Sequence, residues 1–93
     1  MIYHKMEESI VKEIKVFILN KMVRHRLWAH KHTSIHNLSK GLPDNLRSRK
    51  EVRKAIEEIV KEFLISKPTN YGLEVSLDIK KKKEVEKFIG KYL

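Results

Sequence analysis

The stretch SRKEVRKAIEEIVKEFLISKPTNYGLEVSL, residues 48–77, decides the fold because its hydrophobic period changes partway along. Up to Phe63, apolar residues recur at three- and four-residue steps, the spacing of one face of a helix. The predicted apolar stripe is Val52, Ile56, Ile59, Val60 and Phe63. From Leu73 to Leu77, apolar and polar residues alternate, which is the pattern of a half-buried strand. The stretch therefore predicts a helix followed by extended chain.

The sequence also indicates where the helix and the strands of this stretch begin and end. Ser48 and Glu51 stand in the positions of a capping box, which predicts a helix over residues 48–63. FLIS, residues 63–66, is a plausible partner for the later strand. KPTNYG, residues 67–72, supplies the proline, asparagine and glycine of a hairpin connection. We therefore expect a two-stranded hairpin directly after the helix.

Upstream of this stretch, the chain predicts a long helix and a short one. Residues 5–25 form the long helix, with the apolar stripe Met6, Ile10, Ile14, Phe17, Ile18 and Met22. Residues 27–33, LWAHKHT, have no clear period and are expected to be a connection. Thr33 or Ser34 can cap the short helix, which Gly41 and Pro43 end. Its expected buried residues are Ile35, Leu38 and Leu42.

Downstream, Asp78 is expected to cap a last helix. Val85, Phe88, Ile89 and Tyr92 lie on one side of it. A chain of 93 residues makes one domain with one modest core. The predicted order is thus helix, short helix, turn, helix, hairpin and helix.

This order of elements, over roughly residues 6–78, resembles the winged-helix variant of the helix–turn–helix proteins. The segments HKHTSIHNLSKGLP (residues 30–43) and YGLEVSL (residues 71–77) are similar to parts of small archaeal winged-helix proteins. The chain departs from the strict helix–turn–helix pattern. With Gly41 as the turn glycine, Asn37 stands where a small residue is usual and Arg47 where an apolar one is. The turn is therefore expected to be longer.

The resemblance implies an α+β, mostly helical fold with a three-helix core, a two-stranded β-hairpin wing and an extra C-terminal helix. Residues 1–93 then form a single winged-helix domain. Core and wing occupy residues 1–78, and the C-terminal helix occupies residues 79–93.

The charge of the chain is concentrated in its middle third. The formal net charge is +9, and residues 21–54 hold ten cations against only Asp44 and Glu51. Residues 1–20 are balanced, and residues 55–93 carry a net charge of only +1. A uniform lysine bias would have spread the excess along the chain. A basic focus of this kind is expected of a protein that binds a polyanion.

The helix at residues 48–63 is the candidate for reading nucleic acid. In winged-helix proteins the equivalent helix enters the major groove with its N-terminal residues nearest the bases. Carried to this chain, base or groove contacts are expected from Ser48, Arg49, Lys50, Arg53 and Lys54, and Arg47 stands at the same end as a further nucleic-acid contact. Arg49 and Lys50 sit at the positive end of the helix dipole, an unfavourable placement that suggests a negatively charged partner.

The remaining expected contacts come from outside this helix. Phosphate contacts are assigned to Arg24, Arg26, Lys31, Lys40 and Lys67. Tyr71, in the hairpin, either contacts the nucleic acid or packs as a turn aromatic against the hairpin. Both roles for Tyr71 remain open at this point.

Four histidines, His25, His30, His32 and His36, fall within twelve residues. His32 and His36 are four apart, as two metal ligands on one helix are. However, His32 is expected to precede the short helix, no cysteine is present, and the nearest acid is Asp44. We therefore expect no metal site. Loop hydrogen bonds, or phosphate contacts that strengthen as the rings gain charge, are the preferred roles.

Several classes of protein receive no support from the sequence. No glycine-rich phosphate loop, G-x-S-x-G or H-E-x-x-H motif occurs, so no enzyme and no cofactor are expected. No apolar run approaches membrane-spanning length, and the N-terminus lacks the apolar region of a signal peptide. The absence of cysteine fits a reducing compartment, so a cytoplasmic location is expected.

These patterns predict a double-stranded DNA-binding protein, a small transcriptional regulator or chromatin-associated factor. Two alternatives remain open. The same basic surface would serve structured RNA or a ribonucleoprotein, and the winged fold also serves as a protein-interaction module. The last helix is also a candidate contact for a homodimer.

Overall fold

The computed structural model describes the backbone of residues 2–92 and the side chains of residues 7–91. The helices are α1 (Ile2–Arg24), α2 (Arg49–Phe63) and α3 (Lys82–Tyr92), and the strands are β1 (Thr33–Ser34), β2 (Leu64–Thr69) and β3 (Gly72–Leu77). Short 3₁₀ turns span Ile35–Asn37, Asp44–Leu46 and Ile79–Lys81. The fold is α+β and mostly helical, as predicted. The predicted stripe residues Met6 and Tyr92 lie outside the described side chains.

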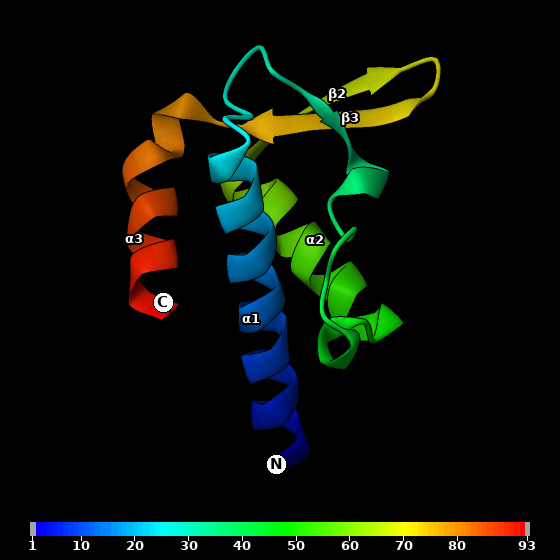
Figure 1. Ribbon diagram of the computed structural model, residues 1–93, viewed down its shortest axis with the longest axis vertical. Helices are drawn as coiled ribbons and strands as arrows, with labels where there is room; N and C mark the ends of the chain where they lie inside the picture. Colours follow the sequence, from blue (N-terminus) through cyan, green and yellow to red (C-terminus); the bar gives the residue numbers. More distant parts are fainter. Residues whose placement is uncertain (1, 93) are drawn as a thin grey trace.

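Helix α1 runs through the middle of the molecule (Figure 1). Helix α3 packs along one side of α1, α2 packs against it as well, and the sheet lies across the C-terminal end of α1. The sheet is antiparallel in the order β1-β3-β2. The core lies where these elements meet, because each presents one apolar stripe or face to the others.

The core residues follow the helical spacings seen in the sequence. The fully buried side chains include Ile14, Ile18 and Met22 from α1, Ala55 and Ile59 from α2, Val75 and Leu77 from β3, and Val85 from α3. Ala55 is completely buried, and its small side chain suits the close packing of α2 against α1. The apolar stripes therefore identified these core positions. They missed the buried Val11, Val16 and Leu19 of α1, and the predicted stripe residues Ile10, Phe17, Val52, Ile56 and Val60 are only partly buried.

A lysine also joins the three helices. The side chain of Lys15 is only 6% exposed, and its Nζ lies 2.9 Å from Glu58 Oε1 and 3.1 Å from Glu62 Oε1. The same ammonium lies 5.1 Å from the centre of the Phe88 ring on α3. The ammonium is thus compensated from two directions, which offsets the cost of burying a charge.

Helix α2 begins as predicted, with Ser48 at its N-cap position. The hydrogen bond differs from a full capping box, because the Ser48 hydroxyl donates to the Glu51 carboxylate. No cap bond from a backbone N–H to the Ser48 side chain is formed. The predicted pairing of these two residues is confirmed, with the donor and acceptor roles altered.

The hairpin is confirmed, but its strands are longer than predicted. Residues 67–69 belong to β2, and only Asn70 and Tyr71 form the loop between Thr69 and Gly72. Thr69 Oγ1 donates to the Gly72 carbonyl and accepts from the Tyr71 N–H. Strand β2 is an edge strand, which is where a sheet tolerates Pro68 and its missing N–H.

The connection at residues 27–33 ends in a short strand that was not predicted, so the hairpin is part of a three-stranded sheet. Thr33 and Ser34 pair with Val75 and Glu74, which adds β1 as a third strand. Trp28 forms a further bridge with Leu77. Two residues are too few to show the alternation of apolar and polar side chains that predicts a strand, so β1 is identified only from its pairing with β3.

The predicted short second helix is much shorter than expected, although Ser34 stands at its N-cap as predicted and accepts a hydrogen bond from the His36 N–H at 3.3 Å. A single 3₁₀ turn, Ile35–Asn37, is followed by turns up to Gly41. The Nζ of Lys21 on α1 donates to the carbonyls of Asn37, Leu38 and Lys40, at 3.0, 3.3 and 2.6 Å. These carbonyls are satisfied by a side chain, so the segment does not need helical bonds. The predicted burial of Leu38 and Leu42 is nevertheless confirmed.

The alternation in β3 holds for its core face only. Val75 and Leu77 are buried as predicted, but Ser76, expected to face solvent, is also fully buried. Its Oγ donates to the Ala29 carbonyl at 2.8 Å. The segment that precedes β1 therefore covers this part of the second face of the sheet.

Candidate functional site

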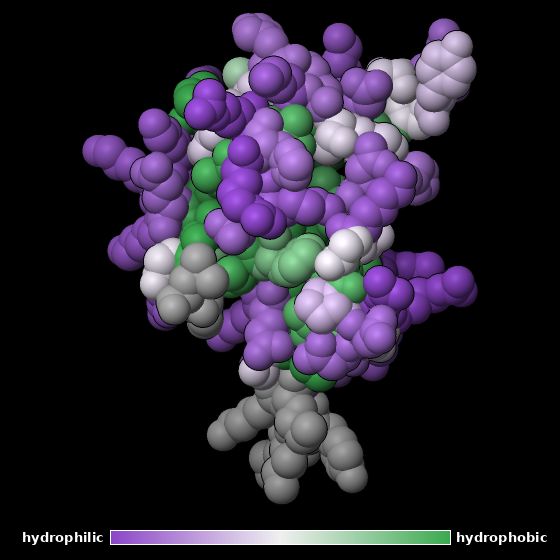
Figure 2. Space-filling model, in the orientation of Figure 1, coloured by the Kyte–Doolittle hydropathy of each residue, from purple (hydrophilic) through white to green (hydrophobic). Residues whose placement is uncertain are grey.

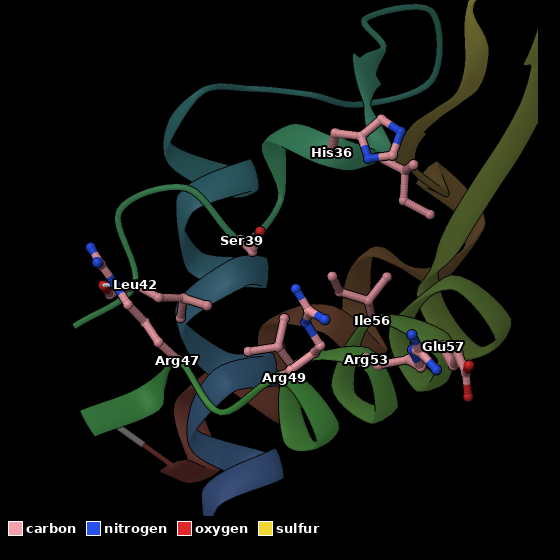
Figure 3. Close-up of a pocket in the computed structure, with 10 residues that line it drawn as sticks. His36, Ser39, Leu42, Arg47, Arg49, Arg53, Ile56 and Glu57 are labelled. Atoms are coloured by element: carbon pink, nitrogen blue, oxygen red, sulfur yellow. Dashed lines mark hydrogen bonds between the residues drawn. The ribbon is translucent and has the colours of Figure 1, made fainter. Parts of the chain in front are cut away.

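A groove of about 720 Å³ lies between α2 and the irregular segment 35–42. We call it the α2 groove. Figure 3 shows the side chains that line it: Ile35, His36, Ser39, Leu42, Arg47, Arg49, Val52, Arg53, Ile56 and Glu57. Its floor is apolar and three arginines border it. The volume falls in the range of ordinary ligand and contact sites.

The arginines reach this groove because of their helical spacing. Arg49 and Arg53 are four residues apart and so lie on one edge of α2. In Figure 3 the guanidinium of Arg49 lies between Ser39 and Ile56, over the groove. Neither guanidinium forms an ion pair with a carboxylate of residues 7–91. Their hydrogen-bond donors are available to an anion.

Arg47 is held in a different way. Its Nε donates to the Leu42 carbonyl at 2.8 Å, and its Nη1 lies 3.4 Å from Asp44 Oδ1. The side chain is still 61% exposed, so it presents an oriented cation at the end of the groove. Arg47 is therefore both a brace for the turn before α2 and part of the charged border.

The start of α2 carries a compensated negative charge. The hydrogen bond from Ser48 holds the pKa of the Glu51 carboxyl below its ordinary value, with further lowering by its own backbone N–H and by Lys50. Glu51 is thus ionised at neutral pH and suits the positive end of the helix dipole. Arg49 and Arg53 lie on another edge of the helix, and neither pairs with Glu51.

Lys50 and Lys54 lie on the other edge of α2, toward α1. Lys50 Nζ lies 3.5 Å from Glu7 Oε1, and Lys54 is half-buried. Lys54 lines a separate hollow with Lys15 and Glu58. The structure therefore divides the predicted contacts of α2 into a groove edge and an α1 edge.

The hairpin tip projects on the same side of the molecule as the 35–47 segment (Figure 1). Tyr71 is 98% exposed, so the alternative in which it packs on the hairpin is wrong. Lys67 is exposed on β2 opposite Glu74 of β3. Tyr71 is thus available for contact, and a carboxylate on the neighbouring strand offsets part of the charge of Lys67.

The other four predicted contacts do not lie on the α2 groove. Arg24, Arg26 and Lys31 are exposed at the C-terminal end of α1 and in the loop to β1. Lys40 borders a hollow of about 390 Å³, together with Lys21, Met22, His25, Leu27, Thr33, Asn37 and Leu38. In Figure 1 the loop between α1 and β1 lies toward one end of the long axis, away from the start of α2.

Three polar residues of these surfaces were not assigned to the site from the sequence. His36 and Ser39 face the α2 groove, and Lys21 supports the segment that carries them. Burial lowers the pKa of Lys21, and the charges of Lys40 and Arg24 lower it further. Only the irregular path of residues 35–42 brings His36 and Ser39 to the groove, and no local pattern signals that path.

The four histidines of residues 25–36 are not gathered around a common point that could hold a metal ion. Among residues 7–91, no group of three or more histidine or acidic side chains is placed to hold a metal ion. His25, His30 and His36 are exposed, and His32 is half-buried. No described helix combines the length and apolar character needed to cross a membrane.

Figure 2 shows that hydrophilic side chains cover most of one face, with apolar atoms visible over α1. A hollow of about 410 Å³ lies there, lined by Ser9, Lys12, Glu13, Val16, Phe17, Asn20 and Leu46. Its lining holds one lysine and one glutamate, whereas the lining of the α2 groove holds three arginines and one glutamate.

Comparison with protein families, curated proteins and solved structures found no match to this chain.

Proposed function

We propose that the chain is a winged-helix protein that binds double-stranded DNA, acting as a small transcriptional regulator or a chromatin-associated factor. Helix α2 would enter the major groove, and the β2–β3 hairpin would lie beside the backbone as the wing. The observation that carries the proposal is the pair Arg49 and Arg53. They lie on one exposed edge of α2, border the same groove as Arg47, and have no ion-pair partner among residues 7–91.

The topology supports this proposal. The order helix, short strand, turn, helix and hairpin, with β1 paired to β3, is compatible with a winged helix. The 3₁₀ turn and irregular chain of residues 35–42 would take the place of the second helix. The exposed hairpin tip adds Tyr71 as a contact beside α2.

The mechanism follows from the division of cations on α2. Arg49 and Arg53 can each donate two parallel hydrogen bonds to guanine O6 and N7, or to a phosphate. Arg47, already oriented by Leu42 and Asp44, would contact the backbone at the end of the helix. Lys50 and Lys54, on the α1 edge, would add charge without reading bases.

A protein-interaction role finds less support. It predicts an exposed apolar patch on the first or last helix. The exposed large hydrophobic side chains among residues 7–91 are Ile65, Tyr71 and Ile79, and none of them lies on α1 or α3. Scattered residues of this kind are ordinary surface features.

The test is fluorescence anisotropy with a random duplex of about 20 base pairs at several salt concentrations, where contact with four to six phosphates gives a log–log slope near −4 to −5. The Arg49→Gln/Arg53→Gln variant should lose about ten- to hundredfold in affinity and flatten the slope by about 2. The matched control, Lys83→Gln/Lys87→Gln on α3, removes the same charge and should bind nearly as the wild type does. Equal losses in the two variants would contradict a specific role for α2.

Competition separates DNA from RNA. The major groove of an RNA duplex is deep and narrow and does not admit a helix. A DNA duplex should therefore displace the labelled probe at a lower concentration than an RNA duplex of the same length. Preferential displacement by RNA would move the assignment to an RNA-associated winged helix.

A further inference from the structure

A second basic surface lies away from the α2 groove. It consists of Arg24, His25, Arg26, His30, Lys31 and Lys40, and we call it the loop surface. All six side chains are exposed. No acidic residue occurs between Glu13 and Asp44, so this whole part of the chain is free of local negative charge. The arginines and lysines of the loop surface form no ion pair with any carboxylate of residues 7–91.

A wall of chain separates the α2 groove from the hollow that His25 and Lys40 of the loop surface border. The wall is the segment 33–42, whose residues alternate between two hollows. Ile35, His36, Ser39 and Leu42 line the α2 groove, whereas Thr33, Asn37, Leu38 and Lys40 line the hollow of about 390 Å³ beside the C-terminal end of α1. A polyanion that occupies one hollow therefore does not occupy the other without passing around the wall.

The loop surface is rigidly mounted. The Leu77 N–H donates to the Leu27 carbonyl at 2.7 Å, and the Ala29 N–H donates to the Leu77 carbonyl at 3.0 Å. The buried Ser76 hydroxyl adds a bond to the Ala29 carbonyl. The cations are thus displayed on a loop fixed to the sheet, which lowers the entropy cost of binding a partner.

Stabilisation of α1 does not explain these charges. Cations at a helix C-terminus favour the dipole only within the last turn, which covers Arg24 but not His30 or Lys31. Arg26 has φ +55°, a conformation that favours glycine. An arginine at a strained position, with no partner, costs stability and points to a role for its side chain.

The chemistry of the loop surface selects its partner. It offers guanidinium, ammonium and imidazole groups but no exposed large hydrophobic side chain, since Trp28 and Leu27 are half-buried. An apolar protein interface or a membrane surface would call for exposed apolar residues. Exposed cations without apolar anchors fit the phosphate backbone of a nucleic acid.

We propose that the loop surface binds the backbone of a second DNA duplex, so that one chain bridges two duplexes. The first duplex is the one held at α2, so this arrangement rests on the proposed function. The contacts at the loop surface are phosphate contacts alone and carry no sequence preference. The protein then joins DNA segments in addition to occupying a site.

The test is energy transfer between two duplexes, one carrying a donor dye and one an acceptor dye, mixed with the full chain. The loop variant is Arg24→Gln/Arg26→Gln/Lys31→Gln, which keeps the backbone strain of residue 26. The control Lys81→Gln/Lys83→Gln/Lys87→Gln removes the same charge from α3 and the 3₁₀ turn before it. The wild type and the control should give energy transfer that disappears at excess protein. The loop variant should abolish it while its affinity for a single duplex stays within about threefold of the wild type.

Two results would overturn the bridging proposal. Energy transfer that survives in the loop variant would mean that the two duplexes are joined by another surface, for example by a dimer of the protein. A loop variant that loses about as much single-duplex affinity as Arg49→Gln/Arg53→Gln would place both surfaces on one duplex. Failure of the proposed function is a separate result, because it appears as unchanged single-duplex binding in the Arg49→Gln/Arg53→Gln variant.

Discussion

The end of α1 gives a sharp prediction about stability. The Arg26 N–H donates to the Val23 carbonyl and the Leu27 N–H donates to the Met22 carbonyl, both at 3.0 Å. This pair of bonds is a Schellman motif, in which the residue at C′ adopts the left-handed conformation and is usually glycine. Here the residue is Arg26, with φ +55°. The substitution Arg26→Gly should therefore stabilise the protein.

The magnitude follows from two opposing terms. A side chain in the left-handed region costs about 1–2 kcal/mol, and glycine removes that cost. Glycine also has more freedom in the unfolded chain, which costs about 0.5–1 kcal/mol. The expected net gain is about 0.5–1 kcal/mol in the free energy of unfolding, or about 2–8 °C in Tm for a domain of this size.

The control for this prediction is Arg26→Ala. It removes the same charge but keeps the Cβ atom and hence the strain, so its unfolding free energy should stay within about 0.5 kcal/mol of the wild type. Urea unfolding followed by circular dichroism measures both variants. If Arg26→Gly is no more stable than Arg26→Ala, the strain argument is refuted, and with it one support for a functional role of Arg26.

Three further predictions concern other parts of the molecule. Lys15→Ala removes two ion pairs and the contact with Phe88, and should lower the free energy of unfolding by about 1–3 kcal/mol. The control Lys87→Ala, at an exposed position, should leave the free energy of unfolding unchanged. Equal effects of the two substitutions would contradict the stabilising role of the buried Lys15. Ser48→Ala should raise the pKa of Glu51 toward 4.5, which a carboxyl NMR titration would detect. A carboxyl pKa that is lowered in the folded state stabilises the fold at pH values above the unfolded-state pKa, and this stabilisation is lost as the pH falls through the folded-state pKa. The free energy of unfolding of the Ser48→Ala variant should therefore fall less on acidification than that of the wild type. An unchanged Glu51 titration would disprove the hydrogen bond. Tyr71→Ala, at a side chain that is 98% exposed, should leave Tm unchanged and weaken duplex binding about two- to tenfold in anisotropy, and an equal affinity would remove the hairpin tip from the interface.

The parts of the fold that were predictable have long periodic patterns. Helix α2 and strand β3 carry enough residues for their periods to be distinct, and the capping pair Ser48 and Glu51 marks where α2 starts. The burial of Leu38 and Leu42 was also predictable, although the helix expected to carry them does not form. Hydrophobic spacing therefore indicated burial more reliably than it indicated secondary structure.

The errors share one physical cause, which is bonding between distant segments. Strand β1 exists because β3 offers an edge for two residues. The path of residues 35–42 depends on Lys21, because its ammonium donates hydrogen bonds to three carbonyls that would otherwise accept from helical N–H groups. Ser76 is buried because of the segment around Ala29. None of these partners is visible in the local sequence.

The candidate site was predicted in composition but not in arrangement. The helical spacing placed Arg49 and Arg53 away from the core, as observed. The position of α1, which takes Lys50 to Glu7, cannot be read from the spacing on α2. The separation of Arg24, Arg26, Lys31 and Lys40 from the α2 groove likewise depends on the tertiary fold. The basic middle third of the sequence is thus divided in the fold between the α2 groove and the loop surface.

The central claim is that α2 and the hairpin tip hold the first duplex. The most direct measurement is the change in amide chemical shifts of ¹⁵N-labelled protein on addition of one short DNA duplex, below the amount that would fill a second site. The largest changes should fall on residues 47–57 and 69–72, and residues 24–31 should change little at this ratio of duplex to protein. Changes concentrated on α3, or on the α1 hollow around Phe17, with residues 47–57 unaffected, would contradict the central claim.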